Sequence, residues 1–531
     1  MKKNKKFKCV IILPAFHLIR KCESDFYLKL FQLDKLEVTS VVMINRKSGV
    51  SNNFFFNLAL NFVQFVESKF TIKNSPDDLA KLKKFLLERI KFLSQKKLWE
   101  DVNNKEICSA DIVLNLNNIP LPNFKFIKTS YGIWSFNHDV KNENYKFQDF
   151  CKYFKQKEIY IMSLYTFINK KNYKIKKFKF NKFKFFLQTK EYAITKSLNF
   201  VFYEIKSIIS KEHTQNYKLF KSNSNNFTVF NIIQYIFFSY SNAIIQKLTP
   251  YNLQINNLEN FKWHLAIVSG NINNINNLEK AKVLTPPTSE FWADPCLVEH
   301  NNEKFIFFEN FQYLKNKGCI AVGRLINNEL KDIKNIISRK YHFSYPHVFK
   351  YKNHFYLIPE TFQAQRLEIW KSKEFPYKWK LHKTFFHGKK LADTSIVKFK
   401  KNFWLFTNIS NDRYNDFTSE LHIFKVSSPL LEKIQPHRRN PVVTDTDNAR
   451  NAGPLFYQND KYLIRPSQAY VNGIYGNYIN FNRIEKLNLD HYKEKIVRKI
   501  KPNFRNDIIG IHHISKHKNQ AVIDIFKNKI K

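Results

Sequence analysis

The stretch FWADPCLVEHNNEKFIFFEN, residues 291–310, contains two short apolar runs separated by a polar turn. Asp294 and Pro295 stand ahead of the first run, and Glu309 lies near the end of the second. A polar start, a strand, a tight turn and a second strand are typical of a β-hairpin. Asp-Pro also opens many turns and bulges, so Asp294 could serve the backbone alone.

The same pattern recurs towards the C-terminus. The further copies are FSYPHVFKYKNHFYLIPET (343–361), LADTSIVKFKKNFWLFTNIS (391–410), RNAGPLFYQNDKYLIRPSQ (450–468) and, more weakly, IIGIHHISKHKNQAVIDIF (508–526). They start roughly 50–60 residues apart, which is room for one four-stranded blade. Five units predict a five-bladed β-propeller over residues 261–531. Equivalent positions on the innermost strands, which we expect to converge on the central axis, are Asp294, Tyr345, Asp393, Gly453 and His512.

The first part of the chain alternates strands and helices. Residues 8–14, 37–44 and 111–116 are short apolar runs suited to buried parallel strands. A helix is expected near 21–33, and Ser75-Pro76-Asp77-Asp78 predicts the start of another, with leucines at helical spacing up to Leu93. This alternation predicts a doubly wound α/β domain over residues 1–166.

Residues 167–260 differ in character and are expected to form a basic, mainly helical connector. They include KKNYKIKKFKFNKFKFF and a charge-free stretch at 222–246. That stretch has the length of a membrane span, but Asn, Gln and Ser recur in it, which favours a helix packed on the protein. A spanning helix and an interfacial helix flanked by lysines are the alternatives.

The charge limits the class of partner. The 531 residues carry 88 Lys+Arg against 44 Asp+Glu, a formal net charge of +44. Such a charge is typical of proteins that bind nucleic acid or an anionic membrane surface. The lysines are scattered along the chain, however, as in proteins encoded by AT-rich genomes. We therefore expect no nucleic-acid partner, and peripheral contact with an anionic membrane stays open.

Cysteine usage and the N-terminus bear on compartment. The six cysteines have no metal-finger spacing and are expected to be reduced thiols. No His/carboxylate set shows ligand spacing, so no metal is expected. The N-terminal run imitates a signal peptide, but it is short, contains Pro14 and lacks a cleavage site. The expected location is cytoplasmic, with a place at the inner face of the membrane as the variant.

The C-terminal half resembles a known family. The segments FWADP, KGCIAVGRL, SYPHVF, YLIPET, ADTSIV, NARNAGPLF and RPSQAYVNGIYG occur in the family's order. They are similar to the propeller domain named after the N-terminal part of plant glucosamine inositolphosphorylceramide transferase. The resemblance implies a five-bladed propeller distantly similar to arabinanase- and invertase-type glycoside hydrolases. It does not extend to the plant enzyme's transferase domain.

The resemblance also implies catalytic positions. Related propeller glycosidases take an Asp from the first blade, an Asp from the third and a Glu from the fourth, because sugar cleavage uses two carboxyls of different pKa. Asp294 and Asp393 match the first two positions. Arg450-Asn451-Ala452-Gly453 stands where the Glu is expected. Glu360 is therefore the third candidate catalytic residue, with Glu309 as another replacement.

Candidate substrate-binding residues lie near the same rim. Arg450, Arg465 and Gln468 are suited to a carboxylate, a phosphate or sugar hydroxyls, although solvated or ion-paired arginines are the plain alternative. Tyr345 and His512 complete the set. Adjacent histidines point to opposite faces of a strand, so at most one of His512 and His513 should face the axis.

The segment ADIVLNLNNIPLPNFKFIKTSYGIWSFNHD, residues 110–139, resembles the formyltransferase fold of methionyl-tRNA and nucleotide-sugar formyltransferases. That family uses an Asn and a His two residues apart, and an Asp, to transfer formyl from 10-formyltetrahydrofolate to an amine. Ser135 stands at the Asn position and Asn137 at the His position, with His138 displaced by one. Together with Asp139 these could support acid–base chemistry. 10-Formyltetrahydrofolate is expected only if this formyltransferase-like domain is active.

These patterns predict a carbohydrate-directed protein with a pocket in the propeller channel. The favoured role is a sugar-modifying transferase, or its substrate-binding component, in surface-glycan biosynthesis. Its partner would be a sugar, nucleotide-sugar or glycan. The alternatives are a glycoside hydrolase using Asp294 and Asp393, a non-catalytic binding module for glycan or nucleotide-sugar, and an amino-sugar N-formyltransferase.

Overall fold

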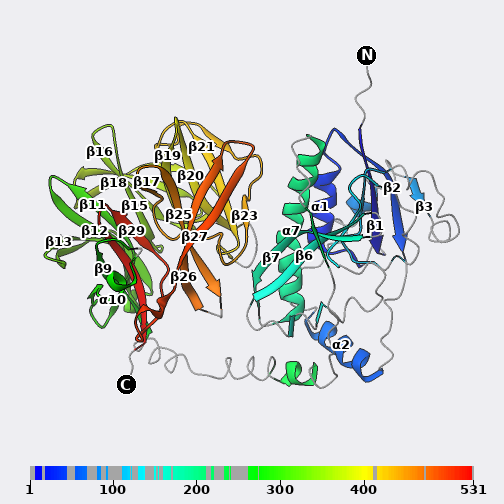
Figure 1. Ribbon diagram of the computed structural model, residues 1–531, viewed down its shortest axis with the longest axis horizontal. Coiled ribbons are helices and arrows are strands. Elements are labelled where there is room, and N and C mark those ends of the chain that lie inside the picture. The colour runs from blue at the N-terminus through cyan, green and yellow to red at the C-terminus, as the bar shows by residue number, and fades with distance from the viewer. Residues whose placement is uncertain are drawn as a thin grey trace, which may run out of the picture. The chain divides into compact units, whose positions relative to one another are not determined.

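The structure is a computed structural model, and the chain divides into two units, Met1–Leu248 and Thr249–Lys531 (Figure 1). Each unit is described by itself. The residues that the structure describes are 6–14, 18–44, 54–67, 80–84, 91–93, 110–119, 121, 129–137, 149–150, 153–154, 159–168, 171–183, 185–210, 217–220, 232–237, 240, 261–272, 274–410, 415–471 and 474–528.

The first unit is built on an eight-stranded mixed sheet with the order β3-β2-β1-β4-β5-β6-β7-β8. The pairs from β3 to β5 are parallel, and those from β5 to β8 are antiparallel. The predicted α/β class is confirmed, but only the parallel part follows a doubly wound order, with its switch point between β1 and β4. The strands are β1 Phe7–Pro14, β2 Leu36–Ile44, β3 Lys91–Leu93, β4 Ile112–Leu114, β5 Ile133–Ser135, β6 Ile159–Ile168, β7 Lys171–Asn181 and β8 Lys218–Leu219.

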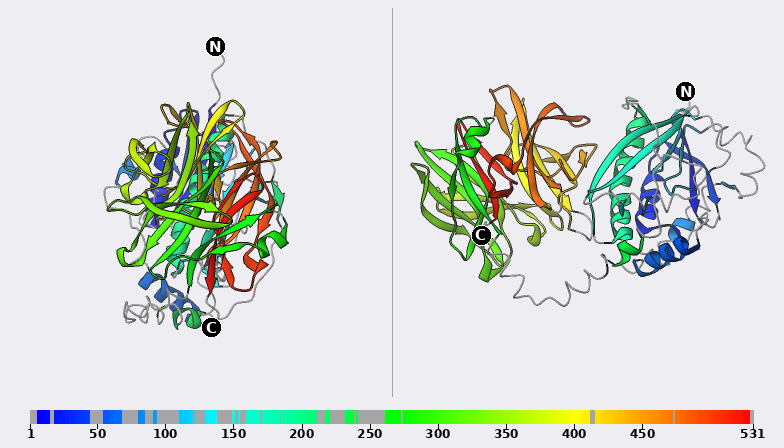
Figure 2. Two further views of the ribbon diagram at one scale, coloured as in Figure 1. Left: turned by 90° about the vertical axis from the view of Figure 1, so that its left-hand side faces the viewer. Right: turned by 60° about the horizontal axis from the view of Figure 1, so that its bottom comes forward.

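The longest helices among the described residues of this unit are α1 (Lys21–Leu30), α2 (Phe54–Glu67) and α7 (Phe186–Ile209). Helix α7 contacts α1, α2 and the β6–β7 hairpin, which is drawn in cyan in Figures 1 and 2. Residues 80–84 are also helical, as the sequence predicted. The same predicted helix was extended to Leu93, which was wrong, because residues 91–93 form β3 and pair with β2.

The expected connector at 167–260 contributes instead to the first unit. The run of lysines and phenylalanines forms β7, in which Phe178 and Phe180 are buried and pair with β6. Alternation of Lys with Phe has the period of two that suits a strand, and the long lysine stems lie along apolar neighbours. Within the described part of the chain, no helix has both the length and the apolar character needed to cross a bilayer. Most of 222–246 lies outside the described residues.

The second unit is a five-bladed β-propeller, as predicted from the repeats. Four blades each take consecutive strands, from the innermost outwards. The first blade consists of β11 Glu290–His300, β12 Glu303–Gln312, β13 Lys317–Ile326 and β14 Glu329–Ile337, and the second of β15 Ser344–Tyr351, β16 His354–Glu360, β17 Leu367–Glu374 and β18 Lys378–Phe385. The third consists of β19 Lys390–Phe399, β20 Asn402–Ser410, β21 Glu420–Val426 and β22 Ile434–Pro436, with β23 Val443–Thr444. The fourth consists of β24 Phe456–Gln458, β25 Tyr462–Val471, β26 Ile474–Leu487 and β27 Tyr492–Ile500.

The fifth blade joins strands from the two ends of the propeller. Strand β9 pairs with β30 along nine residues, from Phe261 opposite Asn528 to Ser269 opposite Gln520. This antiparallel pairing closes the ring, because the outer strands come first in the chain and the inner strands come last. The members of this blade are β9 Phe261–Ser269, β10 Lys282–Leu284, β28 Ile508–Gly510, β29 Ile514–His517 and β30 Gln520–Asn528, and the short helix α10 (Ile275–Glu279) lies between β9 and β10.

Apolar layers between neighbouring blades hold the ring together. Five buried clusters each combine side chains from two adjacent blades, including the closing contact between the fifth and the first. In that last layer Trp292, Leu297 and Ile306 of the first blade pack with Leu265 and Val522 of the fifth. Because every blade packs on both sides, polar side chains that point to the axis are held on a close-packed scaffold.

The innermost strands of the first three blades share a β-bulge with a left-handed residue at the predicted positions. Strands β11, β15 and β19 each carry a bulge, and the residues in it have left-handed backbones: Asp294 (φ 52°), Tyr345 (φ 45°) and Asp393 (φ 49°). Gly453 of the fourth blade has φ 122°. Asp tolerates this conformation better than Tyr does, and a bulge re-aims a side chain. The equivalence of the first three positions is therefore confirmed at the level of the backbone, whereas His512, predicted as the fifth, lies between strands and is not among the described residues with a left-handed backbone.

Candidate functional site

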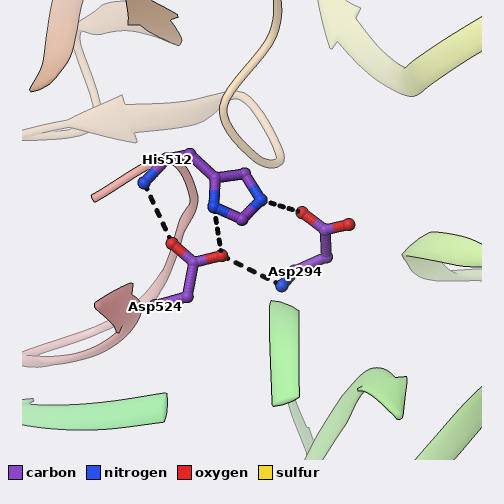
Figure 3. A group of neighbouring side chains, drawn as sticks. All are labelled: Asp294, His512 and Asp524. Carbon is purple, nitrogen blue, oxygen red and sulfur yellow. Dashed lines mark hydrogen bonds and ion pairs between the residues drawn. The ribbon is translucent and has the colours of Figure 1, made fainter. Parts of the chain in front are cut away.

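Asp294 lies where the first blade meets the fifth, at the start of β11 (Figure 3). Its Oδ1 accepts from Nε2 of His512 at 3.0 Å and is 3.1 Å from Nδ1 of His513. Its Oδ2 accepts from the backbone N–H of Tyr345 at 3.1 Å. The carboxylate is buried, and its partners come from the second and fifth blades.

Asp524 of β30 forms the other side of this arrangement. One carboxylate oxygen accepts from the backbone N–H of His512 at 3.0 Å and of His513 at 2.8 Å. The other accepts from the backbone N–H of Asp294 at 3.1 Å and lies 3.0 Å from Nδ1 of His512. Figure 3 shows the imidazole of His512 held between the two carboxylates.

This geometry fixes protonation. Burial alone would raise the pKa of Asp294, but His512 and His513 outweigh it and hold that pKa well below its usual range. Burial lowers the pKa of His512, yet Asp524 and Asp294 more than compensate, so its pKa is raised. The two shifts together favour an ionised Asp294 beside a protonated His512.

A second group surrounds Asp393 of the third blade. Arg450 donates from Nε to Asp393 Oδ2 at 2.6 Å and from Nη2 to Oδ1 at 3.4 Å, a two-pronged ion pair. Gln468 donates from Nε2 to the same Oδ2 at 3.3 Å. Glu360 lies 3.8 Å from Nη2 of Arg450 and accepts the backbone N–H of Asp393 at 3.3 Å. Arg450 thus stands between a carboxylate and a second carboxyl.

Two glutamates of this region favour the protonated form. Burial raises the pKa of Glu360 well above its usual range, with Asp393 adding to the effect and Arg450 opposing it. Burial also raises the pKa of Glu309 strongly, helped by the nearby Asp294 and Glu360. Gly318 is needed beside Glu309, since a Cβ there would lie 2.6 Å from Glu309 Oε1. Neutral carboxyl groups can donate as well as accept hydrogen bonds.

Tyr345 of the second blade contacts residues of all four other blades. Besides its N–H bond to Asp294, its hydroxyl lies 2.9 Å from Ser395 Oγ and accepts the backbone N–H of Gly453 at 3.1 Å. Its ring packs edge-on against His513, with centroids 4.8 Å apart. The side chain is buried. Tyr345 therefore joins the five blades through buried contacts.

Half-buried aromatic rings border the two groups. Trp263 of β9 packs against His512 with centroids 4.2 Å apart, and Tyr475 of β26 lies 5.0 Å from the same ring. Tyr475 also receives Arg450, whose guanidinium carbon lies 5.0 Å from the ring centroid. Tyr475 thus connects the Asp294 group with the Asp393 group. The name axial cluster is used below for the combined set of Asp294, Glu309, Tyr345, Glu360, Asp393, Arg450, Gln468, His512, His513 and Asp524.

The axial cluster contains seven of the eight candidate residues predicted for the propeller; Arg465 lies elsewhere. It is fully buried inside the fourth blade, where it donates from Nη2 to Glu494 at 2.7 Å and to the carbonyl of Asn448 at 2.7 Å. Its Nε donates to Glu494 at 2.9 Å. This position favours a structural ion pair, and substrate binding by Arg465 gains no support from it.

The histidine prediction needs correction. We expected at most one of His512 and His513 to face the axis, but both bond Asp294. Residues 511–513 lie between β28 and β29, outside regular strand geometry, so the alternation of strand faces does not apply to them.

Asp524 and Asn408 were missed, although the sequence carries a signal for Asn408. Glu309, Glu360, Asn408 and Gln468 each stand fifteen residues after Asp294, Tyr345, Asp393 and Gly453 respectively. These second-strand positions bring further polar side chains towards the axis. Asn408 Oδ1 accepts the backbone N–H of Asn451, and Asp524 plays the corresponding part for Asp294. The polar groups of the second strands therefore clamp neighbouring blades together.

Three ligand atoms, from Asp294, His512 and Asp524, lie within 4.8 Å of one another and could hold a metal ion. Both nitrogens of His512 already face the two carboxylates at 3.0 Å. A metal would have to replace one of these contacts and the imidazolium proton, so hydrogen bonding accounts for the arrangement as it stands.

The candidates of the first unit lie near the carboxyl end of the parallel strands. Ser135 ends β5 and is buried; its hydroxyl donates to Asn118 Oδ1 at 3.0 Å and accepts the N–H of Asn137 at 3.0 Å. Asn137 is buried as well. His138 and Asp139 lie outside the described residues.

Comparisons with known proteins place the chain in a family. Residues 237–507, just over half of the sequence, match the family described as "Glucosamine inositolphosphorylceramide transferase 1, N-terminal". The chain belongs to this family. The region of this chain that matches the family covers the first four blades and ends before β28. His512, His513 and Asp524 therefore lie after the matched region.

Curated relatives carry the same name. Glucosamine inositolphosphorylceramide transferase 1 of Oryza sativa subsp. japonica is 33% identical over 210 residues, which are 39% of this chain and 28% of the relative. The Arabidopsis thaliana protein is 30% identical over 210 residues, 39% of this chain and 27% of its own length. The chain thus spans less than a third of the relatives it matches.

Solved structures with similar strand arrangements include a thermostable family-43 glycoside hydrolase, with TM-score 0.31 and 12% identity over 40% of this chain and 76% of that one. An alpha-L-arabinofuranosidase from Lactobacillus brevis gives TM-score 0.34 and 13% identity over 45% and 85%. The assignment of the fold above stands on the strand pairing of the chain itself.

Proposed function

We propose that the propeller binds an uncharged part of a sugar or glycan at the axial cluster. In this proposal the protein is the substrate-binding component of a transferase that modifies glycans or glycolipids. Its partners would be a sugar donor and a glycolipid or glycan acceptor. The transferase name of the plant relatives supports this, although it belongs to proteins more than three times longer than the matched region.

The observation that carries the proposal is the pairing of charges in the axial cluster. Asp294 and Asp524 share His512, and Asp393 is matched by Arg450, while Glu309 and Glu360 favour the neutral form. Such a site has donors and acceptors in close array with little net charge. Sugar hydroxyls need this combination, and half-buried aromatic rings beside it suit the apolar face of a pyranose.

A glycoside hydrolase is the second candidate. Glu360, with a raised pKa, lies beside Asp393, so a general acid and a carboxylate stand together as glycosidases require. Against it, Asp294 accepts hydrogen bonds from His512, His513 and Tyr345, and Asp393 is held by Arg450. Carboxylates that are saturated by protein donors are poor nucleophiles or bases, which favours binding over cleavage.

The test uses Asp→Asn substitutions, because Asn tolerates the left-handed backbone of these positions. Calorimetric titration of neutral saccharides and nucleotide-sugars should show binding that falls at least about tenfold in Asp393→Asn, for the loss of a charged hydrogen-bond partner. Asp460→Asn is the matched control, since Asp460 has φ 53° but lies exposed in a turn. Equal affinities of the two variants, or no saccharide bound at all, would contradict the proposal.

Turnover separates the two candidates. A hydrolase predicts release of the aryl group from aryl glycosides by the wild-type chain and its loss in Asp294→Asn and Glu360→Gln. A binding component predicts no release by any of them while saccharide binding persists.

We also retain, as a separate proposal, formyl transfer by the first unit. Its support is the resemblance around Ser135 and Asn137, at the carboxyl end of the parallel strands where ligands of such sheets bind. Ser135 already bonds two protein groups, which weakens it as a substitute for the usual Asn. Calorimetry of the full chain with a folate would decide: absence of binding would end this proposal without touching the propeller.

A further inference from the structure

Helix α2 has an unusual composition. Its fourteen residues, FFFNLALNFVQFVE, contain a single charged side chain, Glu67 at the last position, and that side chain is buried. A helix this rich in apolar residues is normally covered by other parts of a protein or by lipid. Helix α2 contacts α7.

The other face of α2 carries a stripe of exposed apolar side chains. Leu58 is 58% exposed, Phe62 49% and Phe65 69%. Their spacing of four and three residues places them on one side of the helix. Val63 and Glu67 face the opposite, buried side. Large apolar side chains grouped on a surface mark a contact site more often than scattered ones do.

A second short helix extends this surface. Residues 232–237 are helical, with Ile233 55% and Phe237 66% exposed and Tyr235 buried. The hydroxyl of Tyr235 donates to Glu67 of α2, and Tyr240 donates to the same oxygen at 3.3 Å. This buried carboxyl therefore ties the two helices together, and Figure 1 shows the short green helix beside α2.

Most of the exposed apolar surface of the first unit is concentrated here. Among its described residues, seven large apolar side chains are exposed, and five belong to these two helices. The name apolar face is used below for Leu58, Phe62, Phe65, Ile233 and Phe237.

We propose that the apolar face rests in the interface of an anionic lipid bilayer. Helices with Phe and Leu on one side lie in the headgroup region, and their binding is strengthened by basic residues attracted to anionic lipid. The chain supplies the charge: it carries a net +44, and β7 in the same unit contains five lysines and no acidic residue.

The charge also selects among occupants. A second copy of this chain on the apolar face would bring two strongly positive molecules together, which their repulsion opposes. An anionic bilayer attracts the positively charged protein electrostatically, and the phenylalanines of the apolar face then insert into its interface. The assignment is independent of sugar binding, because the apolar face lies in the first unit and the axial cluster in the second.

Vesicle sedimentation of the full chain tests this. We expect binding to phosphatidylcholine vesicles that contain about 30% phosphatidylserine, and weaker binding without the anionic lipid. Raising salt from about 0.1 M to about 1 M shortens the screening length from about 10 Å to about 3 Å and should weaken binding. The double variant Phe62→Ser/Phe65→Ser should bind at least about tenfold more weakly, because two rings no longer enter the interface.

Leu314→Ser is the matched control, since Leu314 is 96% exposed and belongs to the second unit. It should bind vesicles like the wild-type chain. Ile233→Ser provides an independent loss of binding from the second helix. Equal binding of the double variant and the control would overturn the proposal. So would light scattering that shows, without vesicles, a dimer which the double variant dissociates, because the occupant would then be a second copy.

Discussion

Replacing Tyr345 with Phe removes one oxygen atom from the centre of the propeller. The hydroxyl accepts the N–H of Gly453 in the fourth blade and exchanges a hydrogen bond with Ser395 in the third. Both groups lose a partner at a site that water does not reach, since Tyr345, Ser395 and Gly453 are buried. Gly453 cannot shift easily, because a Cβ on it would already lie 1.9 Å from the carbonyl oxygen of Ile514.

The magnitude follows from these two contacts. Leaving a buried donor or acceptor unsatisfied costs about 1–3 kcal/mol, so the substitution should lower the free energy of unfolding by about 2–4 kcal/mol. The phenyl ring keeps its packing against His513, which separates the hydroxyl's effect from that of a cavity. Ser395→Ala removes the same hydrogen bond between Tyr345 and Ser395, so the losses of unfolding free energy in the two single variants should not add. A double-mutant cycle should give a coupling energy of about 1 kcal/mol.

Urea unfolding followed by tryptophan fluorescence measures this, because five of the seven tryptophans lie in the propeller. Tyr462→Phe is the control: Tyr462 is an exposed tyrosine of the same unit, and its substitution should change the free energy of unfolding by less than about 0.5 kcal/mol. If Tyr345→Phe changes stability no more than Tyr462→Phe does, Tyr345 does not join the blades as described.

Three further predictions concern other buried groups. Burial lowers the pKa of His347 to about 4, so its contribution is present above pH 6.5 and is lost as pH falls towards 4; stability should drop by about 3 kcal/mol over that range, and His347→Gln should flatten the drop in urea midpoints. Arg465→Met should destabilise by about 3–5 kcal/mol in urea unfolding, because Glu494 is left buried and unpaired, whereas adding Glu494→Met should restore much of the loss. Glu67 accepts the N–H of Leu187 at 2.8 Å through one oxygen and the hydroxyl of Tyr235 through the other, whereas Gln has a single acceptor oxygen. Glu67→Gln therefore leaves one of these donors without an acceptor and should lower the free energy of unfolding of the first unit by about 1–3 kcal/mol, measured by circular dichroism.

The repeat made the propeller predictable from the sequence. Each copy carries two signals of the hairpin, a polar start and a run of alternating residues. Because the copies share these signals, a weak signal in one copy can be interpreted from the others. The positions of Asp294, Tyr345 and Asp393 followed from that register, and all three have the left-handed bulge. What the register does not contain is the pairing of charges, because that depends on side chains from blades far apart in the chain.

Other parts were less predictable for definite reasons. Helix α2 was not foreseen, since no acidic residue marks its first turn and no basic residue marks its last. The residues of β7 were interpreted as part of a connector because of their many lysines. The strand is nevertheless part of the sheet, because Phe178 and Phe180 are buried. Arg465 was assigned to the rim for its chemistry, and only the structure shows Glu494 beside it.

The closure of the ring by β9 and β30 has a consequence for biosynthesis. Strand β9 is translated about 250 residues before its partner, so during that time its inner edge has no strand to pair with. The four intermediate blades can pack against one another as they are synthesised. His512, His513 and Asp524 reach Asp294 only when β30 pairs with β9. The candidate site is thus the last part of the propeller to be assembled, and a chain that stops short of β30 leaves a sheet edge exposed for aggregation or for a chaperone.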